Sequence, residues 1–306
     1  MRVQAVLIGA IGLVPVVLGA QGAQPPDQPA VTVRGQTYTP RSILARNMGS
    51  DEDQTTAFPP HRIIGNVYYV GTRTLSSFLI TTPAGHVLIN STYERNVNTI
   101  ADSIAKLGFK MSEVRILLGT HAHGDHQEGD AAVKMLTGAQ VMAMREDVPA
   151  LEAIRPGGKA HPIDRQLRDG DTVTLGGTTL RALWVPGHTQ GATIWMMNVQ
   201  ENGRTYSVAF RGGETPNAGV PLFDNPRHPK VVEDTKFTLE RLKALQPPDL
   251  FLHNHQQNLG RPLNPALPVN PRCITCLDAQ AFKEMVVRSD QGFLQRLKEA
   301  EAERKK

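Results

Sequence analysis

The feature that most constrains the fold of this chain is a run of metal-binding residue types directly after a hydrophobic segment. Residues 120–126 read Thr-His-Ala-His-Gly-Asp-His, and residues 115–118 before them have the pattern of a short buried strand. Side chains at the end of a strand alternate in direction, so His121 and His123 point the same way and can reach one metal ion. The sequence therefore predicts a sheet whose edge carries a metal site.

The rest of this run predicts a second ion beside the first. Gly124 has no Cβ and fits a tight turn, which lets Asp125 and His126 face away from the first pair. Neutral imidazole and carboxylate are ligands that suit zinc. With only ten histidines in 306 residues, such a cluster is not expected by chance.

Zinc binds more than two protein ligands, so distant residues must complete both sites. His188 follows a predicted strand within residues 185–189 (Val-Pro-Gly-His-Thr), and His255 follows the hydrophobic run 250–252. Ligand sites in sheets form beyond the strand ends, so these side chains are expected at one rim. We expect a three-histidine site of His121, His123 and His188, and a second site of Asp125, His126 and His255.

Two adjacent zinc ions predict a hydrolase. Together they lower the pKa of a water molecule from about 15.7 toward about 7, and Asp125 can orient that water or accept its proton. We find no G-x-S-x-G motif, which argues against a serine hydrolase. His253 is an alternative ligand to His255, and four other histidines are interpreted as structural or solvated: His61, His86, His161 and His228.

The strand and helix order is the second constraint on the fold. It reads as strands, helix, strand and helix in each half, which predicts two sheets with helices outside. Strands are expected at 67–70, 77–81, 86–89, 115–118, 140–143, 172–175, 179–185, 193–199, 206–210 and 250–253. Helices are expected at 97–107, 131–136, 237–245 and from about 277.

These motifs resemble the metallo-β-lactamase superfamily over about residues 62–300. The resemblance rests on residues 121–126, on Pro-Gly-His-Thr at 186–189, and on a late histidine after a hydrophobic strand. Residues 187–193 and the first histidine are similar to the third subclass of class B β-lactamases, in which no cysteine binds metal. The resemblance implies an αββα sandwich of two mixed sheets with helices on the outer faces, and two Zn²⁺ ions per chain. It also favours His255 over His253 as the late ligand.

The resemblance implies a hydrolase that opens the amide of a small β-lactam with a zinc-activated water. The alternative is another hydrolase of the superfamily, acting on a lactone, ester or thioester. A metal-binding protein whose catalysis has decayed is a third possibility, against which the six intact ligands speak.

Two positions depart from the family pattern. Members usually carry an aspartate after the strand that here ends at residue 89, and this chain has Asn90 there. Asparagine cannot supply the charge of that supporting carboxylate, which affects metal affinity. The segment 211–216 lacks the serine of many β-lactamases, and Glu214 is a candidate for the bridging carboxylate that glyoxalase II and related hydrolases have there.

The termini and composition predict an exported protein of one domain. Arg2, an apolar run at 5–20 and small residues at 20–23 have the pattern of a secretory signal peptide over 1–23. We expect an irregular leader over 24–60 and the metallo-β-lactamase-like domain over 61–306, located outside the cell or in the periplasm. No other apolar run is long enough to hold the mature chain stably in a membrane.

The charge and the cysteines exclude some other classes of protein. A net charge of +4, without a dense basic run before the C-terminal tail, argues against a nucleic-acid-binding protein. Cys273 and Cys276 cannot form a four-thiolate zinc site, and their place after a proline-rich loop argues against a redox motif. They are expected to form a local disulfide in an exported protein or to remain as two thiols.

Overall fold

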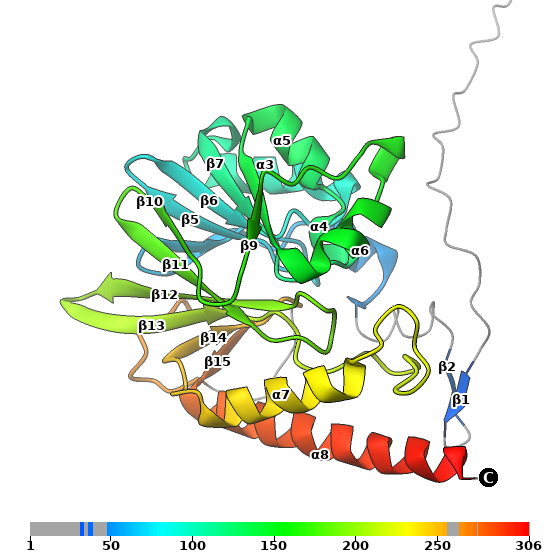
Figure 1. Cartoon of the computed structure of the whole chain (residues 1–306). Helices are drawn as coiled ribbons and strands as arrows, with labels where there is room; N and C mark the ends of the chain where they lie inside the picture. Colours follow the sequence, from blue (N-terminus) through cyan, green and yellow to red (C-terminus); the bar gives the residue numbers. More distant parts are fainter. Residues whose placement is uncertain (1–30, 34–35, 39–47, 256–262, 274, 306) are drawn as a thin grey trace, which may run out of the picture.

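The strand-forming segments pair into two large mixed sheets in the computed structural model (Figure 1). The structure describes residues 31–33, 36–38, 48–255, 263–273 and 275–305, so the predicted signal peptide lies outside the described residues. The first sheet has the order β3-β4-β5-β6-β7-β8-β9. Its strands are β3 (His61–Ile64), β4 (Val67–Tyr69), β5 (Phe78–Thr82), β6 (Gly85–Ile89), β7 (Val114–Leu118), β8 (Gln140–Met144) and β9 (Arg165–Leu167).

The second sheet has the order β10-β11-β12-β13-β14-β15. Each sheet is mixed, because β6 to β9 and the β13–β14 pair are parallel, whereas the other neighbours are antiparallel. The strands of the second sheet are β10 (Thr172–Leu175), β11 (Thr178–Trp184), β12 (Thr193–Glu201), β13 (Arg204–Phe210), β14 (Leu250–Leu252) and β15 (Cys276–Asp278).

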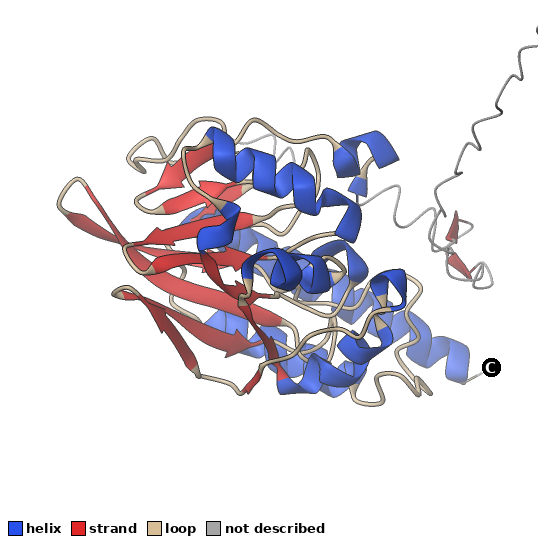
Figure 2. Cartoon of the chain, turned by 90° about the horizontal axis from the view of Figure 1, so that it is seen from above, coloured by secondary structure: helices blue, strands red, loops and turns tan. Residues whose placement is uncertain are grey.

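Helices cover the outer face of each sheet, because parallel neighbours must be joined by crossovers. Figure 1 shows α3 and α5 on one outer side of the two sheets and α7 and α8 on the other, and Figure 2 shows the same helices and strands from above. The helices are α3 (Val97–Lys106), α4 (Gly124–Gln127), α5 (Asp130–Thr137), α6 (Val148–Ala153), α7 (Val231–Ala244) and α8 (Ala279–Arg304). The described residues also form the 3₁₀ turns η1 (Glu94–Asn96), η2 (Met111–Glu113), η3 (Arg145–Asp147) and η4 (Pro156–Gly158).

The alternation of side chains along the strands builds three apolar layers. In β7, Ile116 and Leu118 pack between the sheets, where Trp195 of β12 belongs to the same core, and Leu117 packs under α3. A third cluster joins the outer face of the second sheet to α8, for example at Phe282. This arrangement confirms the predicted αββα sandwich.

The expectation of an irregular segment over 24–60 was wrong for part of it. The segment contains the paired strands β1 (Val31–Val33) and β2 (Gln36–Tyr38), and the short helix α2 (Asp51–Thr55). Helix α2 begins at a capping box in which Ser50 and Asp53 satisfy each other's backbone N–H groups, a start signal that the sequence reading overlooked. The Gln54 carbonyl also accepts a hydrogen bond from Asn96, so this helix packs on the domain.

Three smaller outcomes concern the C-terminal half. Helix α7 begins at Val231, before the predicted start at 237, because two buried valines and two acidic residues already form a favourable first turn. Cys273 and Cys276 form a disulfide, the first of the two alternatives expected for them. Among the described residues, no helix is both long and apolar enough to cross a membrane.

Candidate metal centre

Six predicted ligands meet at one end of the two sheets, although they come from three separate parts of the chain. His121 and His123 follow β7, and the next turn of chain forms α4, which carries Asp125 and His126. His188 lies in the loop between β11 and β12, and His255 follows β14. The structure gathers the six into two groups whose ligand atoms lie within 4.8 Å of one another: His121, His123 and His188, and Asp125, His126 and His255.

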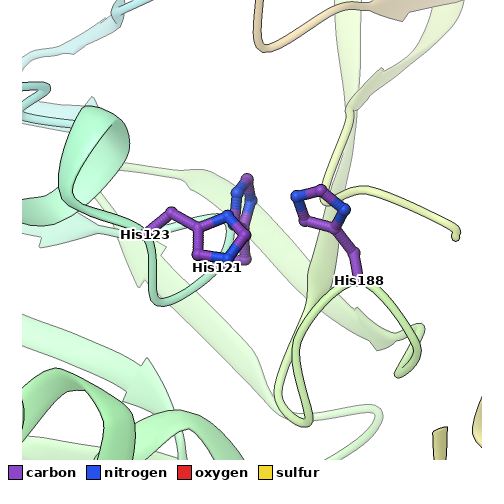
Figure 3. Close-up of side chains that lie close together, drawn as sticks. All are labelled: His121, His123 and His188. Carbon is purple, nitrogen blue, oxygen red and sulfur yellow. The ribbon is translucent and has the colours of Figure 1, made fainter. Parts of the chain in front are cut away.

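The three-histidine group has its rings facing a common point (Figure 3). The ring centroids of His121 are 4.7 Å from those of His123 and 4.5 Å from those of His188, and the latter two rings are 4.8 Å apart. His188 Nδ1 donates a hydrogen bond to the Thr215 carbonyl oxygen at 2.8 Å. Because a carbonyl only accepts, this bond fixes the hydrogen on Nδ1 and leaves the lone pair on Nε2 for a metal.

The second group is built around the carboxylate of Asp125. Its Oδ2 lies 3.0 Å from His126 Nε2 and 3.4 Å from His255 Nε2. The backbone of the late histidine is fixed by the loop between β4 and β5, since His255 forms an isolated β-bridge with Leu75. The two groups are adjacent, because the His121 and His126 ring centroids are only 4.2 Å apart.

The donor atoms fit zinc. Four ligands at about 2.0–2.1 Å in a tetrahedron lie about 3.3 Å from one another, close to the two distances measured around Asp125 Oδ2. His121 Nε2 is buried and has no hydrogen-bond partner. Buried polar atoms are normally paired, so this unpaired nitrogen fits a residue that binds an ion.

Burial and crowding hold these groups in the protonation states that metal ligands need. Burial, followed by repulsion from neighbouring histidines, lowers the pKa of His123 to about 3, and burial lowers that of His188 to about 4. Burial also lowers the pKa of His255 to about 3. Burial opposes ionisation of Asp125, but the adjacent His126 outweighs it and keeps the carboxyl pKa below its usual range.

The structure separates His253 from the candidate metal ligands. Its Nδ1 accepts a hydrogen bond from the His255 backbone N–H at 3.2 Å and lies 3.3 Å from Arg211 Nη1. Burial, then the charge of Arg211, lower the pKa of His253 well below its ordinary value. His253 therefore supports the backbone of the late ligand, and it is His255 that joins Asp125 and His126.

Glu214 is also bound elsewhere. Its carboxylate accepts two hydrogen bonds from Arg211, at 2.6 and 2.8 Å, and one from Ser289 Oγ at 2.9 Å. Burial raises the pKa of Glu214, but the charge of Arg211 outweighs it and the net shift is downward. Glu214 is therefore a buried ionised partner of Arg211 and does not take the place of a bridging carboxylate.

Asn90 lies behind the second group, as its place after β6 predicts. Its Oδ1 accepts hydrogen bonds from Thr120 N (3.0 Å) and Thr120 Oγ1 (3.1 Å), and its Nδ2 lies 3.4 Å from His126 Nδ1. An amide thus stands where the resemblance implies a carboxylate, next to His126 of the second group.

The other four histidines lie outside both groups and have partners of their own. His61 stacks on Tyr69, His86 lies near Glu113, His161 near Asp130, and His228 near Asp234. Two supporting residues escaped the sequence analysis, namely Thr215, which orients His188, and Asp147, whose carboxylate contacts both ligand loops. No local motif identifies either, because their partners lie 25 to 44 residues away along the chain.

Comparison with known proteins identifies the family of this fold. The family model described as metallo-beta-lactamase superfamily matches residues 70–255. The FEZ-1 metallo-β-lactamase of Legionella gormanii is 38% identical with a TM-score of 0.72, over 81% of this chain and 98% of that one. The class B3 di-zinc metallo-β-lactamase LRA-12 from an Alaskan soil metagenome is 29% identical with a TM-score of 0.71, over 80% of this chain and 97% of that one.

Curated relatives match a shorter part of the chain. The hydroxyacylglutathione hydrolase of Hyphomonas neptunium is 40% identical over 96 residues, which is 31% of this chain and 33% of that protein. The chain thus spans about a third of that relative, and about half of others with the same description. The family match and the near-complete overlap with solved metallo-β-lactamases show that this chain belongs to the metallo-β-lactamase superfamily.

Proposed function

We propose that the protein is an exported β-lactamase that uses two zinc ions, one held by each group of ligands. The observation that carries this proposal is the composition of the centre. Its donors are five histidines and one aspartate in two adjacent groups, and Glu214 is occupied by Arg211 and Ser289. This set agrees with the all-histidine-plus-aspartate pattern implied for the third subclass of class B, and it lacks a bridging carboxylate.

The chain's own residues prepare the site for hydrolysis. Zinc bound to these residues would supply Lewis acidity and lower the pKa of a water to about 7. Asp125 is ionised and buried next to His126, so its carboxylate can accept a hydrogen bond from the attacking water and orient it. Burial keeps His188 neutral, and the hydrogen bond to the Thr215 carbonyl fixes the orientation of its ring. A β-lactam amide is easier to hydrolyse than an ordinary amide, because ring strain weakens amide conjugation, so such a site suffices for it.

Hydrolysis of a thioester is the second candidate, because the curated relatives are hydroxyacylglutathione hydrolases. A hydroxyacylglutathione is a thioester, and a zinc centre of this kind suits that reaction too. Against this candidate stands the engagement of Glu214 with Arg211, since the bridging carboxylate of such hydrolases is expected in this segment.

A substrate panel with zinc-loaded protein tests the proposal. We expect hydrolysis of a penicillin, a chromogenic cephalosporin or a carbapenem, and loss of most of this activity in Asp125→Asn. The matched control is Asp164→Asn, since the Asp164 carboxylate pairs with Lys134 and accepts from the backbone N–H of Val141, and neither partner is a candidate ligand. If all three drug classes remain intact while a lactone or an acylglutathione is cleaved, the β-lactamase proposal is wrong and a broader zinc hydrolase remains.

A further inference from the structure

Asp147 connects the two loops that carry the three-histidine group. Its Oδ2 accepts a hydrogen bond from the backbone N–H of Ala122 at 2.8 Å, and Ala122 lies between His121 and His123. The same oxygen accepts a hydrogen bond from Thr189 Oγ1 at 2.8 Å, directly beside His188. One carboxylate thus joins segments of the chain that belong to different sheets.

A third hydrogen bond fixes the far side of the His188 loop. Asp147 Oδ1 accepts from the backbone N–H of Gly191 at 2.6 Å. The approach is so close that a Cβ on Gly191 would lie 2.5 Å from Asp147 N and 2.7 Å from its Cγ. Only glycine fits at this contact, so the loop is drawn tightly onto the carboxylate.

Asp147 is buried, and none of these three hydrogen-bond donors belongs to a cationic group. Only 2% of the residue is exposed, and it lies at the end of η3, between β8 and α6. Burial raises its pKa to about 6, although the three donors and the nearby His228 act in the opposite direction. All three contacts are hydrogen-bond donors, which is the arrangement that an ionised carboxylate accepts, and hydrogen bonds to a charged acceptor are the stronger kind.

We propose that Asp147 is the positioning residue of the three-histidine site, because it sets the distance between the loop of His121 and His123 and the loop of His188. The three imidazoles must approach one point to bind an ion together, and each loop alone would place its histidines independently. Asp147 itself contacts neither the ion nor a substrate. The inference rests on the proposed metal centre but not on the identity of the substrate.

The test measures zinc affinity at one site at a time. In a His255→Ala background only the three-histidine site is complete, and in a His188→Ala background only the second site is complete. Zinc dissociation constants are measured by competition with a chromophoric chelator. Adding Asp147→Asn to the first background should weaken zinc binding by about 10–100-fold. In the second background the same change should alter the affinity by less than about threefold.

Two further variants keep the result interpretable. Thr189→Val removes one of the three hydrogen bonds and should weaken the three-histidine site by a smaller factor, even if Asp147→Asn does not fold. Asp164→Asn, which also removes a carboxylate that accepts a backbone N–H, that of Val141 in β8, should leave both affinities unchanged. Unchanged affinity of the three-histidine site in both Asp147→Asn and Thr189→Val, or equal losses at both sites, would overturn the proposal. Because no step depends on hydrolysis, failure of the β-lactamase proposal would not mimic either result.

Discussion

Replacing Asn90 with aspartate should strengthen the second metal site. Because Thr120 N–H is a donor, the atom of Asn90 that faces it must be Oδ1, which leaves the Nδ2 amide group 3.4 Å from His126 Nδ1. When His126 binds an ion through Nε2, its neutral ring carries a hydrogen on Nδ1. Two donors then face each other. A carboxylate at residue 90 would accept from both Thr120 and His126.

The size of the effect follows from this single contact. Supporting hydrogen bonds to a metal-binding histidine typically change metal affinity by about 10–100-fold, which corresponds to about 1.4–2.7 kcal/mol. Asn90 is completely buried, and an ionised carboxylate there is costly without an adjacent cation. Asn90→Asp should therefore bind the second zinc about 10–100-fold more tightly, while the melting temperature of its metal-free form falls below that of the parent.

Chelator competition and thermal unfolding, each with and without zinc, measure both parts of this prediction. The matched control is Asn96→Asp, an equally buried asparagine that donates to the Gln54 carbonyl and to Thr92 Oγ1. The control should lose stability in both states and gain no zinc affinity. If Asn90→Asp binds the second zinc no more tightly than the parent does, the reasoning about facing donors is refuted.

Three other predictions follow from the site and the sequence. The His255→Ala variant should lose the second zinc, whereas the His253→Ala variant should retain most of it. Metal analysis after dialysis measures the zinc content of both variants, and a greater loss in His253→Ala would make His253 the ligand. The metal-free protein should lose stability as the pH falls from about 6.5 toward 4. Burial lowers the pKa values of His123 and His188 to about 3 and 4, so over this range the histidines of the unfolded chain bind protons that the folded chain does not. Chemical denaturation at several pH values measures the change, and a rise in stability on acidification would contradict it. Export should remove the signal peptide between residues 20 and 23, and N-terminal sequencing of periplasmic protein would detect this, whereas an intact N-terminus in the cytosol would argue against it.

The sequence predicted those features that have a local signature. The strand and helix order predicted two sheets with helices outside, and the family resemblance implied the αββα sandwich. The six candidate ligands could be recognised because each lies three to eight residues beyond the end of a strand. The roles of Glu214 and His253 needed the structure. Both contact Arg211, which is three residues from Glu214 and 42 residues from His253 along the chain.

Supporting contacts were beyond the reach of the sequence for the same reason. Asp147 lies in a short charged stretch, Arg-Glu-Asp at 145–147, that is typical of a solvated turn. Its role depends on the packing of β8 against the loops that carry Ala122 and Gly191. Periodicity and turn chemistry predict helices and strands. They do not predict which carboxylate will join two loops, because that depends on how the sheets pack.

The most direct test of the account is the location of zinc in crystals of zinc-loaded protein, from anomalous scattering at the zinc absorption edge. We expect two peaks per chain. One should lie about 2.0–2.1 Å from nitrogen atoms of three histidines, and the other at similar distances from two histidines and one carboxylate, namely His121, His123 and His188, and Asp125, His126 and His255. A single peak at saturating zinc, or a peak bound by His253 or Glu214, would contradict the two-zinc centre proposed for this chain.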